Sequence, residues 1–255
     1  MLADLLGQFH DKVYVVTYAA AKERQRSAVE QLGEGTFEFV YGVDKRDVTR
    51  EDLIADGTYD EELAMRTDFR GRELTLGHIC CAIGHRRAYQ KMLEDGCERA
   101  LIFEDDVVAL PVDRAEIKTI LANVPPDAEL IQWGWIGGRF RPPLGQIQQA
   151  IFHVRHALGR YQLNHRMIRN IYMRRYNPHF HVASGNTFAH AYTITRSAAE
   201  TFMRWTTPIR LFADHVLVHA TLAGQVKAYV SATQLFGQRS IDPDDPLESL
   251  TQKYY

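Results

Sequence analysis

Short apolar runs and helical periodicities alternate along the first part of the chain. Residues 13–16 form an apolar, β-branched run that predicts a buried strand, and good helix formers follow over residues 19–32. Residues 36–41 alternate aromatic and polar positions, which predicts a second strand. A strand, a helix and a strand in this order are typical of a nucleotide-binding α/β domain.

The strongest helical pattern covers residues 76–94, where apolar positions recur once per helical turn. Residues 100–103 then form an apolar run that predicts a buried strand. This strand leads directly into three adjacent acidic residues, Glu104, Asp105 and Asp106. The carboxyl end of a strand in an open α/β sheet is where ligands bind, so this turn is the first candidate site.

The remaining pattern is weaker. Polar residues 44–69 predict a loop with one or two short helices, and Ser197 with Glu200 form a capping-box pattern at the start of a helix. Further elements are expected as helices within residues 147–172 and over 197–205 and 213–223, and as strands over 129–133, 190–195 and 226–230. We therefore expect an α/β fold with further helices in the basic region.

The composition of the chain bears on where in the cell the protein is expected. Hydrophobic residues make up 45% of the chain and charged residues 24%, which is ordinary for a soluble globular protein. No apolar run approaches a bilayer-spanning length, and residues 1–11 lack the pattern of a signal peptide. The three cysteines include the neighbours Cys80 and Cys81, which rarely bridge each other. Reduced thiols in the cytoplasm are therefore expected.

The net charge of −2 hides a strong asymmetry. Residues 130–199 contain no Asp or Glu but nine Arg and six His, which leaves 21 Lys and Arg against 32 Asp and Glu elsewhere. Such a segment is expected near something anionic: a diphosphate, a phosphorylated acceptor, an acidic lipid or a nucleic acid. The alternative is a basic surface that only balances the acidic remainder.

The three adjacent carboxylates point to a divalent cation. Like charges held together raise one another's pKa, and a cation removes that cost. Oxygen ligands suit Mg²⁺ or Mn²⁺, which commonly bridge carboxylates to substrate phosphates. Alternation along an extended chain aims Glu104 and Asp106 the same way, with Asp105 opposed. We expect Asp106 as the main ligand and Glu104 as a direct or water-mediated one; a solvated acidic turn is the alternative.

A zinc site is a further option that the helical pattern disfavours. His78, Cys80, Cys81 and His85 all fall within the helix expected over residues 76–94. We expect the helix to spread these side chains around its axis, and the chain has no second cysteine pair. No zinc site is therefore expected here.

Five blocks in order carry a family resemblance over residues 13 to about 240. They read VYVVTYAAAKER at 13–24, FVYGVDKRD at 39–47, LGHICCAIGHRRAY at 76–89 followed by ALIFEDDV at 100–107, AHAYTITRSAAE at 189–200, and PIRLFADHVL at 208–217. Together they resemble glycosyltransferase family 25, which includes bacterial lipooligosaccharide galactosyltransferases and collagen galactosyltransferases. The sequence departs from the family pattern near the expected nucleotide pocket at Thr17, Lys45, Cys80 and Gly84.

The resemblance implies a single GT-A domain over residues 1–255. In this α/β fold, helices flank a Rossmann-like nucleotide-binding sheet and the basic insertion is helical. Residues 1–133 would bind the nucleotide sugar, and residues 134–255, with the basic insertion 134–186, would bind the acceptor. It further implies a metal-dependent, inverting transfer of galactose or glucose from a UDP-sugar to a glycan such as lipooligosaccharide or lipopolysaccharide (LPS). Mn²⁺ or Mg²⁺ would be the cofactor, held by Glu104 and Asp106.

The resemblance also assigns roles to single residues. Asp214 is the candidate base that would deprotonate the acceptor hydroxyl, with a helix N-cap as its alternative role. The candidate donor-binding residues are Thr17, Arg24, Asp44, His85, Asp105, His190, Tyr192 and Gln238, the last within a Q-x-S pattern that ends at Ser240. Structural roles remain open for several of them: a buried histidine for His85, core packing for His190 and Tyr192, turn capping for Asp44, and solvated charge for Arg24.

Other functions remain open at this point. A degenerate transferase fold could bind nucleic acid or membrane through its arginines, and two carboxylates could serve a glycosidase. Protein or modified DNA could replace the glycan acceptor. The expected location is the cytoplasm, and the Arg-rich region 139–175 permits a peripheral contact with the inner membrane face.

Overall fold

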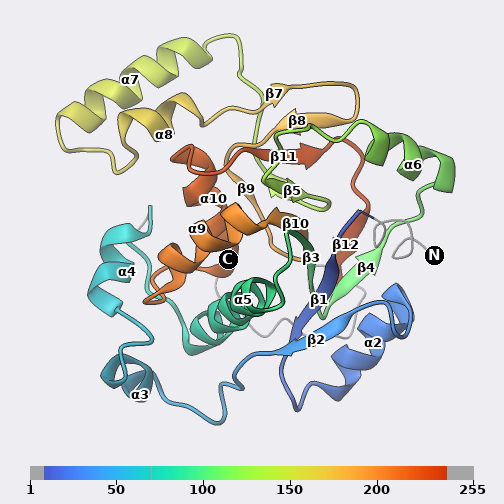
Figure 1. The fold of residues 1–255 in the computed structure, drawn as a ribbon. Coiled ribbons are helices and arrows are strands. Elements are labelled where there is room, and N and C mark those ends of the chain that lie inside the picture. Colours follow the sequence, from blue (N-terminus) through green and yellow to red (C-terminus); the bar gives the residue numbers. More distant parts are fainter. Residues whose placement is uncertain (1–8, 70, 240–255) are drawn as a thin grey trace.

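A computed structural model describes residues 9–69 and 71–239 of the 255-residue chain. Ser240 and the C-terminal tail lie outside the described residues. The fold is built on an eight-stranded, mixed sheet with the strand order β2-β1-β3-β10-β5-β11-β8-β7 (Figure 1). In chain order, its strands are β1 (Lys12–Thr17), β2 (Glu38–Tyr41), β3 (Arg99–Glu104), β5 (Leu130–Gln132), β7 (Arg174–Arg175), β8 (Phe180–Val182), β10 (Ala191–Thr195) and β11 (Ala228–Ser231).

The predicted opening of the chain is confirmed. Strand β1 pairs in parallel with β2 on one side and with β3 on the other, and α2 (Lys22–Leu32) connects β1 to β2. Val16 in β1 lies opposite both Val40 in β2 and Glu104 in β3. The three strands therefore end at one edge of the sheet, which is where the acidic turn lies.

The middle of the sheet joins strands that are far apart in sequence. Strand β10 lies antiparallel between β3 and β5, and β11 runs parallel to β5. At the far edge β8 and β7 are antiparallel neighbours. Strands that precede residue 133 in the chain and strands that follow it therefore share one mixed parallel and antiparallel sheet.

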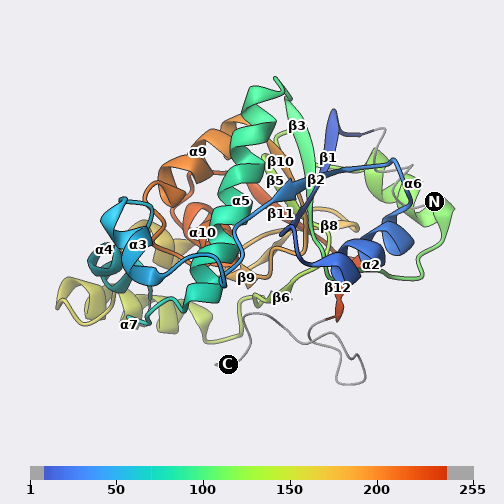
Figure 2. The same cartoon turned by 90° about the horizontal axis from the view of Figure 1, so that it is seen from below.

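Helices cover both faces of this sheet, because side chains along each strand alternate between two hydrophobic clusters. In β1, Tyr14 and Val16 face one cluster and Val13 and Val15 the other. The first cluster is covered by α5 (Leu76–Glu94), α9 (Arg196–Thr206) and α10 (Ala213–Leu222), and the second by α2 and α6 (Arg114–Ala122). Figure 2 shows α5 running along the face of the sheet on the side of α9 and α10, with α2 and α6 on the other side.

Helix α5 has the bounds expected from its periodicity. Thr75 caps its first turn in a reciprocal capping box with His78. Gly84 lets the helix approach β1 closely, since a Cβ at this position would lie 2.7 Å from the Val16 side chain. This contact brings the first half of α5 directly over the end of β1.

The other short elements complete the fold. Helices α3 (Arg50–Ala55) and α4 (Glu61–Thr67) are the two short helices expected after β2, and the basic region forms α7 (Gly145–Ala157) and α8 (His165–Arg169). Two small antiparallel pairs were not predicted. They are β4 (Val107–Ala109) with β12 (Phe236–Gln238), and β6 (Ile136–Gly137) with β9 (Asn186–Thr187).

The predicted cap of α9 is wrong. Thr195, not Ser197, is the N-cap: its backbone is extended and its side chain accepts a hydrogen bond from the Ala198 amide. Ser197 lies in the first turn and donates to Glu129 Oε1 at 2.7 Å. The helix begins early because β10 leads into it without a connecting loop.

Within residues 9–69 and 71–239, no helix combines the length and the apolar character needed to cross a bilayer.

Candidate functional site

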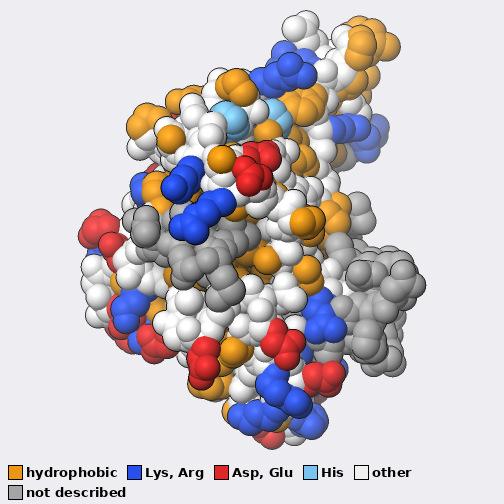
Figure 3. All heavy atoms as spheres, turned by 90° about the vertical axis from the view of Figure 1, so that its right-hand side faces the viewer, with side chains coloured by type: hydrophobic (Ala, Val, Ile, Leu, Met, Phe, Trp, Pro, Cys, Tyr) orange, Lys and Arg blue, Asp and Glu red, His pale blue; other side chains and the backbone are white. Residues whose placement is uncertain are grey.

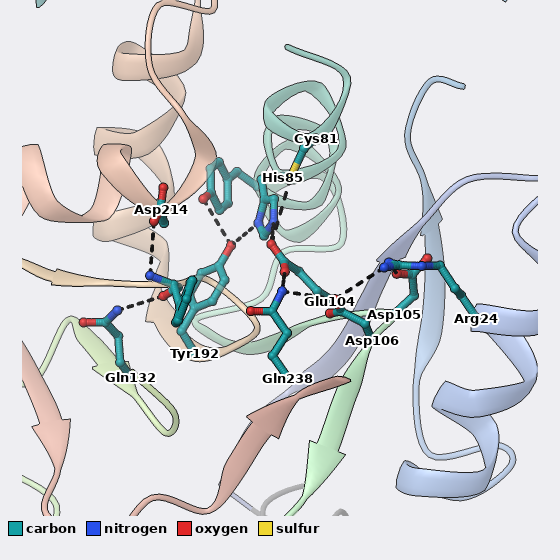
Figure 4. A network of polar contacts seen from close by, with 12 residues as sticks. Arg24, Cys81, His85, Glu104, Asp105, Asp106, Gln132, Tyr192, Asp214 and Gln238 are labelled. Carbon is teal, nitrogen blue, oxygen red and sulfur yellow. Dashed lines mark hydrogen bonds and ion pairs between the residues drawn. The ribbon is translucent and has the colours of Figure 1, made fainter. Parts of the chain in front are cut away.

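A pocket of about 320 Å³ lies where β1, β2 and β3 end against the first half of α5. Eight residues predicted from the sequence line it: Thr17, Arg24, Asp44, His85, Glu104, Asp105, Asp106 and Gln238. Three others, His190, Tyr192 and Asp214, do not line it. Figure 4 shows the polar network that connects most of these side chains.

Asp105 is held on one side of the acidic turn by groups from β1 and α2. Thr17 Oγ1 donates to Asp105 Oδ2 at 2.7 Å, and Arg24 Nη1 lies 2.5 Å from Asp105 Oδ1. The second guanidinium nitrogen of Arg24 lies 3.4 Å from Asp106 Oδ2. Burial raises the pKa of Asp105, and the Arg24 charge and the Thr17 hydrogen bond partly offset this rise.

Glu104 and Asp106 converge on a different partner. The amide nitrogen of Gln238 donates to Glu104 Oε2 and to Asp106 Oδ2, each at 3.1 Å. Gln238 reaches the acidic turn because β12 pairs with β4, which places Gln238 opposite Val107. The two outer carboxylates of the triplet thus face one point, while Asp105 faces Thr17 and Arg24.

His85 links Glu104 to the core. His85 Nε2 lies 3.0 Å from Glu104 Oε1, and His85 Nδ1 lies 2.8 Å from the Tyr192 hydroxyl, which donates to the Tyr89 hydroxyl. Burial acts to raise the pKa of Glu104, but the hydrogen bond and charge of His85 lower it below its usual value. Tyr192 therefore contacts the pocket only through His85, and it packs in the core.

Cys81 joins this network, which sequence reasoning missed. The ligand atoms of Cys81, His85 and Glu104 all lie within 4.8 Å of one another. The expectation that α5 spreads its cysteine and histidine side chains apart is wrong for Cys81 and His85, since residues four apart share a helix face. Burial and the charges of Glu104 and Asp214 raise the pKa of the Cys81 thiol well above its usual value.

The outer part of the pocket carries mixed charges from the segment after β2. Asp44 accepts three hydrogen bonds from the Arg46 side chain and one from its backbone amide, so Asp44 caps this turn as well as lining the pocket. The hydrogen bond from Arg46 lowers the pKa of Asp44. Lys45 also lines the pocket, so basic groups flank the carboxylates here.

His190 lies behind the pocket rather than in it. Its Nε2 donates to the Phe236 carbonyl at 3.3 Å, and burial lowers the pKa of its imidazole. The backbone at Gly134 passes so close to His190 that a Cβ added to Gly134 would lie 2.1 Å from His190 Nε2. His190 therefore holds β10 against the segment that carries Gln238.

Asp214 occupies the first turn of α10 but is not its N-cap, which is Phe212. Its Oδ2 accepts a hydrogen bond of 3.2 Å from the Phe188 amide, and Gln132 Nε2 donates to the Phe188 carbonyl at 2.9 Å. Phe188 has a φ of 74°, a left-handed conformation that is costly for an aromatic residue. Asp214 and Gln132 thus fix a strained loop beside the network shown in Figure 4.

The residues present fit a divalent cation. Two carboxylates, Glu104 and Asp106, converge on the Gln238 amide nitrogen, which lies 3.1 Å from an oxygen of each. Such an oxygen-rich arrangement is the preference of Mg²⁺ and Mn²⁺. Cys81 and His85 add softer ligand atoms next to Glu104.

Fold and site together define an α/β protein with an acidic pocket at the carboxyl ends of parallel strands, the usual ligand position in open α/β sheets. The comparison with protein families then identifies it further. The model of "Glycosyltransferase family 25 (LPS biosynthesis protein)" matches residues 10–217. The chain belongs to this family, and the family indicates a glycosyltransferase.

One solved structure similar to this chain is the "Crystal Structure of A197 from STIV". The two overlap with a TM-score of 0.37 and 10% sequence identity, over 87% of this chain and 81% of that chain. A likeness at this level defines neither substrate nor mechanism.

Proposed function

We propose that this chain moves a hexose, galactose or glucose, from a UDP-sugar to a glycan acceptor of the lipooligosaccharide or LPS type. The observation that carries the proposal is the convergence of Glu104 and Asp106 on one point at the strand ends, with Arg24 beside them. In a GT-A arrangement this is where the donor diphosphate would lie. The intact acidic triplet argues against a degenerate fold that only binds anionic surfaces.

Different residues of the pocket would hold different parts of such a donor. Glu104 and Asp106 would hold Mn²⁺ or Mg²⁺, which when bound supplies positive charge to the leaving diphosphate. Arg24, Lys45 and Arg46 line the same pocket and would add hydrogen bonds and charge. Asp44, after β2, would accept hydrogen bonds from the nucleoside.

His85 and Thr17 would position the carboxylates. The hydrogen bond from His85 lowers the pKa of Glu104, which keeps that group ionised for the cation. Thr17 and Arg24 hold the Asp105 carboxylate, and Arg24 also contacts Asp106, so the Arg24 charge reduces the repulsion between these two carboxylates. Each contact fixes a side chain before the donor arrives, which lowers the cost of binding.

Asp214 would act as the base in an inverting transfer. Its charge contributes to raising the Cys81 pKa, so it is electrostatically coupled to a residue that lines the pocket. With donor and acceptor bound, Asp214 would accept the proton of the acceptor hydroxyl as that oxygen attacks the anomeric carbon. The hydrogen bond from the Phe188 amide holds the Asp214 carboxylate in place.

A donor screen tests the proposal. The protein is incubated with UDP-galactose or UDP-glucose and Mn²⁺, and UDP release is measured for wild type and Asp106→Asn. We expect slow UDP release by wild type and at least a hundredfold loss in Asp106→Asn, with Glu98→Gln, an exposed carboxylate, as the unaffected control. Calorimetry that shows UDP binding independent of added Mn²⁺ or Mg²⁺ would contradict the metal assignment.

A further inference from the structure

Helix α7 carries a continuous row of exposed aliphatic side chains. Counted with its two cap residues, the row consists of Leu144, Ile147, Ile151, Val154 and Leu158, which are 70, 59, 52, 59 and 63% exposed. Spacings of three and four residues place all five on one face of the helix. They are five of the eleven large hydrophobic side chains that are exposed within the described residues, so this face is the main apolar surface of that part of the chain.

The opposite face of α7 accounts for its attachment to the protein. Phe152 stacks on Tyr161 with ring centroids 4.6 Å apart, and Gln149 Nε2 donates to the Ile168 carbonyl at the end of α8 at 2.8 Å. Phe152 and Tyr161 pack against the small cluster around Met167. The helix is therefore fixed through one face, and the aliphatic row points away from the body of the protein.

The charged side chains of the segment that carries the row are all positive. Exposed arginines surround α7 in a segment without a single Asp or Glu: Arg139, Arg141, Arg155, Arg160, Arg166 and Arg169. None of these six forms an ion pair with a carboxylate of the described residues. Figure 3 views the molecule from the side opposite α7, and its uppermost part shows hydrophobic, basic and histidine side chains.

An aliphatic row between arginines fits an anionic bilayer surface better than a second copy of the chain. Two copies pairing through α7 would bring two arginine-rich, acid-free surfaces together, which like-charge repulsion opposes. Anionic lipid headgroups instead neutralise the arginines while the aliphatic side chains enter the acyl boundary. A helix of 13 residues is about 20 Å long, which suits lying in the interface and not spanning it.

We propose that α7 docks the protein on an anionic lipid surface, with the row from Leu144 to Leu158 inserted and the flanking arginines on the headgroups. In Figure 2, α7 lies along the same edge of the molecule as the beginning of α5, where the pocket lies. Docking through α7 therefore places the pocket on the side of the membrane surface. The proposal stands on the exposed row and the charges, and it holds whatever the pocket binds.

Vesicle co-sedimentation tests this docking, with vesicles of phosphatidylcholine alone and of phosphatidylcholine mixed with phosphatidylglycerol. We expect binding to the mixed vesicles only, and less of it as salt is raised. The variant Ile147→Ser/Ile151→Ser removes two aliphatic side chains and lowers the binding constant at least tenfold. Arg155→Gln/Arg160→Gln lowers it about twenty-five-fold on the mixed vesicles, since each arginine near the surface contributes roughly fivefold.

The control removes exposed hydrophobic side chains from another surface. Ile54 and Met65 are 40 and 46% exposed on α3 and α4, so Ile54→Ser/Met65→Ser is a matched change outside α7. It should bind vesicles as wild type does, and all three variants should keep the wild-type melting temperature. Equal binding by the α7 and control variants would overturn the proposal. So would light scattering that shows a dimer which Ile147→Ser/Ile151→Ser converts to a monomer.

Discussion

His85 Nε2 lies 3.0 Å from Glu104 Oε1, which joins the longest helix of the fold to the end of a central strand. Both groups are enclosed: the His85 side chain is 1% exposed and that of Glu104 19%. The contact therefore has two consequences. It ties α5 to the sheet, and it sets the ionisation of a carboxylate that faces the proposed cation.

Replacing His85 by Phe is expected to move the acidic limit of Mn²⁺ binding to higher pH. Burial alone would raise the pKa of Glu104, and the His85 hydrogen bond now lowers it, so its loss lets the pKa rise. Because only the ionised carboxylate binds the cation, binding is then lost at a higher pH. Calorimetric titration of Mn²⁺ over a pH series measures this, and an unchanged pH profile would contradict the positioning role.

Arg24→Gln is expected to destabilise the fold by about 3 kcal/mol, because it leaves the Asp105 carboxylate buried without its charge partner. Their side chains are only 12 and 6% exposed, so water does not replace the lost contact. Urea denaturation measures the change. The double variant Arg24→Gln/Asp105→Asn should recover most of the loss, and additive effects of the two substitutions would argue against their coupling.

Asp214→Asn separates catalysis from loop structure. The amide oxygen of Asn can still accept the hydrogen bond from the Phe188 amide, so the strained loop should remain in place. A base cannot be replaced by an amide, and we expect kcat to fall about a hundredfold or more while UDP affinity is kept. A fall of less than tenfold, measured as UDP release with saturating donor and acceptor, would exclude Asp214 as the base.

The stability of the fold is expected to fall as pH drops from 7 to 5. Burial, with a smaller contribution from His215, lowers the pKa of His219 to about 3, and burial lowers that of His78 to about 4. In the unfolded chain both titrate near 6.5, so the unfolded state binds more protons over this range and gains stability. For His219, which is 2% exposed, the loss is about 2 kcal/mol.

The variant His219→Phe isolates this contribution. His219 stacks on Phe69 with ring centroids 3.8 Å apart, a contact that a phenyl ring can keep. Its free energy of unfolding should therefore depend less on pH between 5 and 7 than that of wild type. Parallel urea denaturations across this range compare the slopes, and an unaltered slope would show that His219 does not titrate on unfolding.

Elements long enough to show a repeating pattern of apolar positions could be predicted from the sequence. Pairings between short segments that are far apart in the sequence could not. The bounds of α5 follow from its repeating apolar positions. In contrast, β12 and β9 have three and two residues, which is too short to show an alternation of apolar and polar positions. Gln238 was suggested by family resemblance, but its contact with Glu104 and Asp106 depends on the β4–β12 pairing.

The sequence also could not show which apolar helix faces are buried and which are exposed. The spacing from Leu144 to Leu158 is visible in the sequence, yet such a pattern normally indicates a face packed on the core. Only the structure shows that this face is exposed. The cluster of Cys81, His85 and Glu104 had a local signal in the four-residue spacing of Cys81 and His85, but the position of Glu104 against them depends on how β3 packs under α5.

The insertion of β10 between β3 and β5 dictates when this protein can become stable during synthesis. Until residues 191–195 leave the ribosome, β3 keeps an open edge, and the strand that leads to the acidic turn has no neighbour on that side. Bringing β10 beside β3 requires closing a loop of roughly ninety residues, which slows folding. A fragment that stops after residue 133 should therefore aggregate through that unpaired edge, even though it contains most of the pocket.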